Sequence, residues 1–238
     1  MNSKDMTIRH TESGFSVVYQ SAVVRNIDVN CNTGTLVLYF ADNRIISIDV
    51  SKFVELSKAY HSQFGITFTN DGKHFFVQSW ETGLFCFDAE TGKLLWHNKQ
   101  KKAYNIATWE NVVLCQYYGK CLSVISLESG LIIRSYPLAV GATFKPLSQK
   151  YYLVGPQRGF YQILDSNLSR HAKVSVAQLN PNALDTFIIH QATLTEGCIV
   201  VKGVEYTGDL FRAAISKKTT DAFIESSRFE REIPIALQ

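Results

Sequence analysis

The sequence predicts an all-β protein, a single β-propeller built from four-stranded sheets. A short motif that ends in glycine recurs, as the segments Ile8–Gly14, Cys86–Gly92 and Val124–Gly130 show. With two weaker copies, the aligned positions are 10, 49, 88, 126 and 165, which are 39, 39, 38 and 39 residues apart. A repeat of this length is typical of a propeller, in which each blade is one four-stranded unit.

Length and composition agree with one soluble domain over residues 1–238. A chain of 238 residues and 26.8 kDa buries roughly 70% of its extended surface, so it needs no disulfide or metal to build a core. The first twenty residues are polar, and no run of 18 apolar residues occurs. We therefore expect a cytoplasmic protein without a membrane partner.

The second and third repeats each show four short strands separated by turns. In the second repeat, Asn70–Lys73 and Glu81–Gly83 are turns, and Gly72 allows a positive φ. The strands expected in these repeats are 65–69, 74–80, 84–89, 93–98, 104–108, 112–118, 121–127 and 131–136.

The first and fourth repeats follow the same plan less regularly. In the first, Ser51–Lys58 fits a strand or a short helix, because Phe53 and Leu56 lie three residues apart and no turn glycine precedes them. The other strands expected here are 23–29, 35–40, 44–50, 142–145, 151–154, 160–164 and 172–176.

The middle strands are apolar on both faces. Leu36–Phe40 and Val112–Cys115 do not alternate between apolar and polar residues, as strands of a half-exposed sheet would. This pattern favours sheets stacked face to face.

The two ends of the chain predict how the ring closes. Thr7–Tyr19 aligns with the last two strands of a repeat, and a fifth repeat spans about 186–228. The remaining tail, Arg231–Leu237, can then supply an inner strand to the incomplete N-terminal blade, which would remove an open sheet edge. We therefore predict six blades, one of them shared between the termini, with five as the alternative.

The segment Asp88–Trp96 resembles the repeat of the quinoprotein-like and WD40-like propeller superfamily. In that repeat an Asp ends the third strand, Thr-Gly makes the turn and a Trp packs on the fourth strand. The Trp-Asp and Gly-His dipeptides of WD40 repeats are absent, so the chain looks like a divergent member and no binding residue is carried over. In format alone, it is also similar to propeller-type immunity proteins of bacterial toxin-delivery systems.

No motif for catalysis or metal binding occurs. HExxH, CxxC, GxSxG and phosphate-binding glycine loops are all absent, so we expect neither enzymatic activity nor a cofactor. We interpret the five cysteines as buried free thiols. Asp49, Asp88 and Asp165 form a carboxylate ring or each bind the turn that follows, and we favour the second interpretation.

The loops carry the partner-binding prediction. In a propeller, the loops between second and third strands share one face with the loops between blades. The densest basic run, Lys99–Lys102, lies in such a loop and suits either solvent or an acidic partner. The residues we expect to bind a partner on this face are Lys58, Tyr60, His61, Glu81, Lys101, Lys102, Lys120, Arg158, Tyr206 and Asp209.

These observations favour a non-enzymatic protein-binding propeller. Within that class the format suggests an immunity or inhibitor protein that binds and neutralises a cognate toxin, for example a nuclease. The net charge of +3 counts against a basic toxin as partner. The alternatives are an adaptor subunit of a larger complex and an enzyme with a site in the axial channel. Aromatic residues near the basic loop are few, so we do not expect a nucleic-acid partner.

Overall fold

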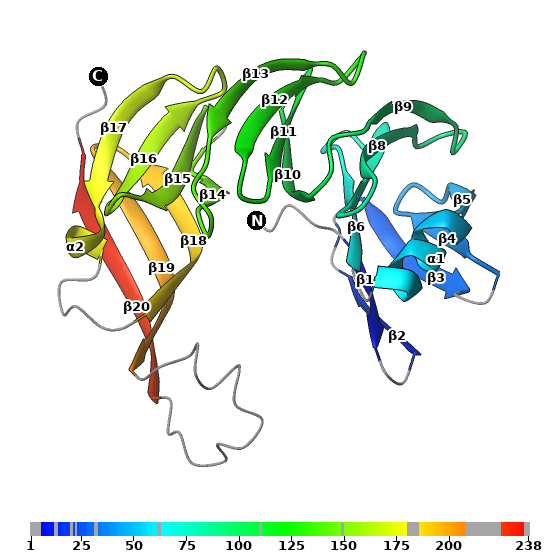
Figure 1. The fold of residues 1–238 in the computed structure, drawn as a ribbon, viewed down its shortest axis with the longest axis horizontal. Helices are drawn as coiled ribbons and strands as arrows, with labels where there is room; N and C mark the ends of the chain where they lie inside the picture. The colour runs from blue at the N-terminus through cyan, green and yellow to red at the C-terminus, as the bar shows by residue number, and fades with distance from the viewer. Residues whose placement is uncertain are drawn as a thin grey trace. The chain divides into compact units, whose positions relative to one another are not determined.

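The computed structural model describes residues 6–11, 14–19, 21, 23–30, 33–60, 63–109, 111–148, 150–179, 186–207 and 225–235. The chain divides into two compact units, 2–137 and 138–238, which are treated separately below (Figure 1). The single domain over residues 1–238 stays a prediction. Both units consist mainly of antiparallel sheets, which confirms the all-β fold class.

The first unit, residues 2–137, contains three sheets: β3-β4-β5, β2-β1-β6-β7-β8-β9 and β10-β11-β12-β13. Its elements are β1 Met6–Thr11, β2 Gly14–Tyr19, β3 Val24–Asn30, β4 Thr35–Phe40, β5 Ile45–Asp49, α1 Ser51–Tyr60, β6 Gln63–Phe68, β7 His74–Ser79, β8 Gly83–Asp88, β9 Leu94–Asn98, β10 Ala103–Trp109, β11 Val112–Tyr117, β12 Cys121–Ser126 and β13 Ile132–Pro137.

The second unit, residues 138–238, contains two sheets: β14-β15-β16-β17 and β18-β19-β20. The last three strands are ten residues each, the longest in the described chain (Figure 1). The elements are β14 Thr143–Pro146, β15 Tyr151–Gln157, β16 Phe160–Asp165, β17 Arg170–Ser175, α2 Val176–Leu179, β18 Thr186–Thr195, β19 Cys198–Thr207 and β20 Glu225–Pro234.

The prediction of a blade shared between the termini is wrong. At the N-terminal end, β1 pairs directly with β6, so the hairpin β1–β2 extends the sheet of the second repeat. Met6 and Ile8 are buried in the same core cluster as Phe64 and Ile66. This shared core explains why β1 pairs with the edge strand β6.

The C-terminal tail is likewise paired elsewhere. Arg231–Pro234 is the end of β20, which runs antiparallel to β19 from Thr207 to Cys198. Its apolar residues alternate, and Phe229, Ile233 and Ile235 face the core cluster that contains Ile199. The described residues therefore form five sheets, each assembled within one unit. Residues 208–224 of the predicted fifth repeat lie outside the described residues.

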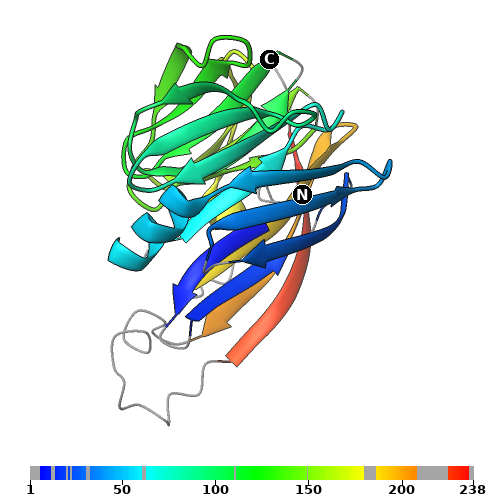
Figure 2. The same cartoon turned by 90° about the vertical axis from the view of Figure 1, so that its right-hand side faces the viewer.

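The ambiguous segment after β5 is the helix α1 (Figure 2, cyan). The Asp49 carboxylate accepts a hydrogen bond of 2.9 Å from the backbone N–H of Ser51, at the point where the helix begins. Phe53, Val54 and Ser57 are the buried residues of the helix, and the Phe53 ring lies 4.9 Å from that of Phe85. A helical face therefore covers apolar surface where the other repeats continue with a strand.

The sheet of the second repeat is buried on both faces. On β7, Phe75 and Val77 belong to one core cluster, whereas Phe76 belongs to another that includes Ile106 and Val113 of the next sheet. β11 is buried in the same way. β4 differs from the prediction, because Val37 and Tyr39 are only half-buried and alternate with buried neighbours.

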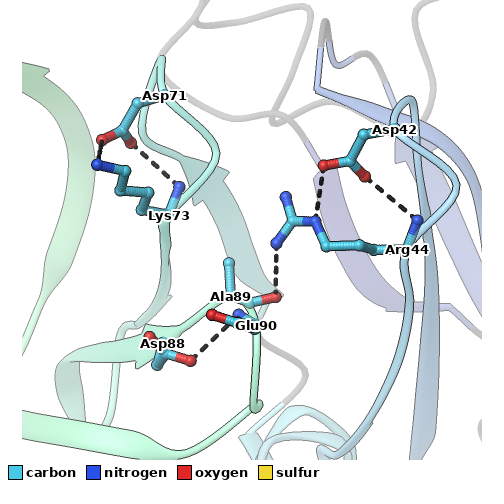
Figure 3. Close-up of polar contacts among 7 residues, drawn as sticks. All are labelled: Asp42, Arg44, Asp71, Lys73, Asp88, Ala89 and Glu90. Carbon is cyan, nitrogen blue, oxygen red and sulfur yellow. Dashed lines mark hydrogen bonds and ion pairs between the residues drawn. The ribbon is translucent and has the colours of Figure 1, made fainter.

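The repeated aspartates bind the turns that follow them. The Asp88 carboxylate accepts a hydrogen bond from the backbone N–H group of Glu90, at 3.1 Å (Figure 3), and another from that of Thr91, at 2.7 Å. Asp165 accepts from Asn167 and Ser169, both at 2.8 Å. These contacts confirm the turn-binding interpretation over a carboxylate ring.

Figure 3 also shows how the first two sheets meet at their turns. The Arg44 guanidinium forms an ion pair with Asp42 at 2.7 Å, and it donates to the backbone carbonyl of Ala89 at 3.5 Å. Lys73 pairs with Asp71 in the same region, at 3.9 Å. Since these groups are largely exposed, each pair contributes little to stability.

Trp96, the tryptophan of the family-like motif, anchors the third sheet to the second. Its indole N–H donates to the backbone carbonyl of Leu127 at 2.7 Å, and the Asn98 amide donates to Gly130 at 3.0 Å. Gly130 has a φ of +70°, and a Cβ atom there would lie 2.6 Å from the Trp96 ring. The turn therefore requires glycine for two reasons: its backbone has a positive φ, and a side chain at this position would collide with the indole.

We predict that Gly130→Ala lowers the free energy of unfolding more than Gly141→Ala does. Both glycines have a positive φ, of +70° and +83°, but nothing lies within 4 Å of a Cβ atom at Gly141. The additional loss at Gly130 should be about 1–3 kcal/mol, because the indole must move. Urea unfolding of both variants measures this difference, and equal losses would show that Trp96 tolerates the methyl group.

We predict that the stabilising effect of the Asp88 charge disappears in acid. Hydrogen bonds from Thr91 hold the pKa of the Asp88 carboxyl below its usual range. Since the folded pKa lies below the unfolded value, near 3.9, this stability is present above that value and is lost as the pH falls through the folded pKa. Asp88→Asn should therefore destabilise the protein at pH 7 but much less at pH 3.

Urea unfolding at both pH values tests this prediction, with Glu90→Gln in the same turn as the control. The control should unfold like the parent protein at both pH values. A loss for Asp88→Asn that is the same at pH 3 as at pH 7 would mean that the charge itself contributes nothing.

Candidate functional site

Three connections of the first unit meet at one end of its sheets. The backbone N–H of Lys102 donates to the carbonyl of Trp80 at 2.7 Å, and the N–H of Tyr118 donates to the carbonyl of Lys102 at 3.0 Å. These bonds join the β7–β8 turn, the β9–β10 connection and the β11–β12 turn. We call residues 80–82, 99–102 and 118–120 the loop cluster. The expected grouping of loops from successive repeats is thus present in this unit.

A pocket of about 200 Å³ lies beside the loop cluster. It is lined by residues of α1, β6, β7 and β10 and of the β7–β8 turn: Tyr60, Gln63, Gly65, Gln78, Trp80, Glu81, Ala103 and Tyr104. Tyr60 and Glu81 belong to the residues predicted to bind a partner. The structure therefore brings together the end of the helix after the first repeat and a turn of the second repeat, which are about 20 residues apart in the sequence.

Aromatic rings connect the pocket with the loop cluster. The Trp80 ring lies 5.2 Å from that of Tyr118, and Tyr118 lies 6.1 Å from Tyr104 with the two planes at 70°. The exposed fraction of Tyr118 is 37%, whereas the neighbouring Tyr117 is completely buried. Alternation along the end of β11 therefore directs only one of this tyrosine pair to the surface.

Gln78 is the buried polar residue of the pocket lining, and its side chain is 2% exposed. Its amide nitrogen donates to the backbone carbonyl of Tyr104 at 3.0 Å, and this contact fixes which end of the carboxamide is the oxygen. That oxygen, Oε1, has no hydrogen-bond partner among the described residues. Gly65 leaves room for this arrangement, since a Cβ atom there would lie 2.9 Å from the Gln78 nitrogen.

The lysines of the loop cluster have no carboxylate partner among the described residues. Lys101, Lys102 and Lys120 are exposed, and none of them forms an ion pair within the described part of the chain. The Lys102 ammonium lies 5.8 Å from the centre of the Trp80 ring, within the range of a cation–π contact. The part of the loop cluster that carries these lysines, which we call the rim of the pocket, is therefore positively charged.

The other predicted residues are not brought to the pocket lining. Lys58 is exposed on α1, two residues before Tyr60. Arg158 is exposed in the β15–β16 turn of the second unit, where its φ is +50°. His61 and Asp209 lie outside the described residues. Tyr206, which we expected in a connection, lies in β19, because that strand continues to Thr207 and pairs with both neighbours.

Sequence reasoning did not select Gln63, Gln78 or Trp80, although all three line the pocket. Gln78 and Trp80 fall in the strand expected over 74–80, whereas the partner-binding prediction concerns loops. The available signal was a tryptophan directly before the turn Glu81–Gly83, at the end where the basic loop was already expected.

No group of three or more His, Cys, Asp or Glu residues in the described ranges has the arrangement of a metal site. Burial raises the pKa of the Cys86 thiol to about 12, and it also raises that of Cys115. These two thiols stay protonated at neutral pH, and thus they are poor nucleophiles. Over the same described ranges, neither helix has the length and hydropathy needed to cross a membrane.

No protein-family model and no curated protein matches the chain. Solved structures do match. BamB from Moraxella catarrhalis is 12% identical, with 85% of this chain covered and a TM-score of 0.53. The Pan2 WD40 domain of Neurospora crassa is 10% identical, with 83% of this chain and 66% of that chain covered and a TM-score of 0.47. The Cps50 (Swd1) β-propeller domain of Myceliophteria thermophila is 11% identical, with 88% and 72% covered and a TM-score of 0.42.

These similarities concern the fold. The chain spans 58% of the length of the BamB structure. This similarity supports the predicted β-propeller fold. At such low identity, no binding residue is transferred from these structures.

Proposed function

We propose that this chain is a non-enzymatic protein-binding propeller whose loop cluster and adjoining pocket contact the partner. The observation that carries this proposal is the joining of three connections by backbone hydrogen bonds around an aromatic pocket. Such a surface is held in place before binding, so little conformational entropy is lost when a partner docks. Trp and Tyr are the residues that most often dominate binding energy at protein interfaces.

The positive charge of the loop cluster indicates which kind of partner surface would dock there. Lys101, Lys102 and Lys120 stand on the rim without carboxylate partners in the described chain, so their charges are available to acidic groups of another protein. Complementary charge mainly raises the rate of association and the specificity of a complex, and salt screens it. The proposed partner therefore presents an acidic patch.

The narrower hypothesis, a toxin-neutralising immunity protein, stays a prediction. It is compatible with an acidic patch on a toxin domain, and it predicts one stoichiometric partner. An adaptor subunit would instead bring down several components of one assembly. The identity of the captured proteins separates these two possibilities.

The test is a pull-down of the tagged protein from its native cell extract, read by mass spectrometry, with a charge-reversed variant in parallel. Lys101→Glu combined with Lys102→Glu should weaken capture of the partner at least roughly tenfold and should flatten the dependence of its affinity on salt. The control is Lys73→Glu with Lys93→Glu, which makes the same change in net charge on exposed turns at the other end of the strands.

A partner retained equally by both variants at all salt concentrations would exclude the loop cluster as the docking surface. A single captured toxin domain, followed by inhibition of that toxin in a purified assay, would support the immunity hypothesis.

A further inference from the structure

We propose that the pocket receives the side chain of one arginine from the bound protein. This inference rests on the proposed function, because it names the group that would enter the pocket. The occupant is chosen by three properties of the lining: its acceptors, its rings and its size.

The acceptors require a side chain that carries hydrogen-bond donors. Glu81 is the acidic residue of the lining, and Gln78 contributes a carboxamide whose Oε1 atom has no partner in the described chain but is itself buried. Since Oε1 is buried, the accessible acceptor of the lining is the partly exposed Glu81 side chain, and a carboxylate bonds most strongly to a charged donor. A guanidinium carries five N–H donors and no acceptor, which suits this carboxylate.

The rings favour a flat cation. Tyr60, Trp80 and Tyr104 contribute to the lining, and indole faces attract positive charge. The protein's own Lys102 ammonium already lies 5.8 Å from the centre of the Trp80 ring, so this ring is in a position to contact a cation. A guanidinium stacks on aromatic faces and is less strongly hydrated than an ammonium, which favours arginine over lysine as the occupant.

The size favours one side chain over a metabolite. The volume of about 200 Å³ is below the roughly 300–1,000 Å³ of pockets that hold drug-sized molecules. The basic rim then specifies the surroundings of the arginine, because Lys101, Lys102 and Lys120 would repel further cations. The recognised element is therefore an arginine flanked by acidic residues.

The experiment is a titration of the full chain, labelled with nitrogen-15, with N-acetyl-arginine N-methylamide. The probe contains the guanidinium but no acidic residue, so it tests the pocket independently of the rim. The analogue with citrulline in place of arginine has nearly the same shape and no charge. The indole N–H resonance of Trp80 is assigned as the one that disappears in Trp80→Leu.

We expect the Trp80 resonance to shift with the arginine probe and to saturate, with a dissociation constant on the order of millimolar. The citrulline probe should bind at least roughly tenfold more weakly, because its hydrogen bonds are not assisted by charge. Glu81→Gln should weaken the arginine probe by a similar factor. Glu90→Gln, an exposed change in the β8–β9 turn, should leave binding unchanged.

Equal shifts with both probes, or no saturable shift at all, would overturn the arginine assignment. Because the probe assay needs no partner, its result is separate from that of the pull-down. If capture of the partner requires Lys101 and Lys102 but the Trp80 resonance does not shift with the arginine probe, only this inference is refuted. If the arginine probe binds saturably but the charge-reversed variant captures the partner as well as the parent protein does, the proposed docking surface is refuted instead.

Discussion

Burial of both faces of the β6–β9 sheet is the constraint on which the first unit depends. Phe75, Val77, Phe85 and Phe87 enter one core cluster, and Phe76, Leu84 and Cys86 enter the other. A sheet with apolar side chains on both faces is stable only when neighbouring layers cover both. The stacking of sheets therefore follows from the composition of these strands, and it brings connections from successive repeats to the same end.

The turn contacts then fix how neighbouring sheets meet. Trp96 spans from β9 to the turn before β13, where the glycine backbone leaves space for the indole. At the opposite end of the strands, the backbone of Lys102 joins three connections of two neighbouring sheets. A pocket lined by strand and turn residues is thus held by the core and by main-chain hydrogen bonds, which do not depend on the identity of the exposed side chains.

The pocket and its rim differ in their electrostatics. The lining has the Glu81 carboxylate and the unpartnered carboxamide oxygen of Gln78, whereas the surrounding lysines carry positive charge. A buried acceptor that the fold leaves without a donor reduces stability, and such groups are rare in native proteins. A partner that supplies both a donor to the lining and acidic groups to the rim would satisfy both regions at once.

The repeat period and the apolar strands by themselves determined the fold class, most strand positions in the regular repeats and the turn-binding role of Asp88 and Asp165. These features depend on neighbours in the sequence, which the period aligns. The sequence also placed Glu81, Lys102 and Lys120 on a common loop face. Only the tertiary structure decided that β1 pairs with β6, that β20 pairs with β19 and that Tyr60, Gln78 and Trp80 line one pocket. The physical reason is that edge pairing and pocket formation depend on which buried surfaces match across long sequence separations, and no local pattern of residues encodes that choice.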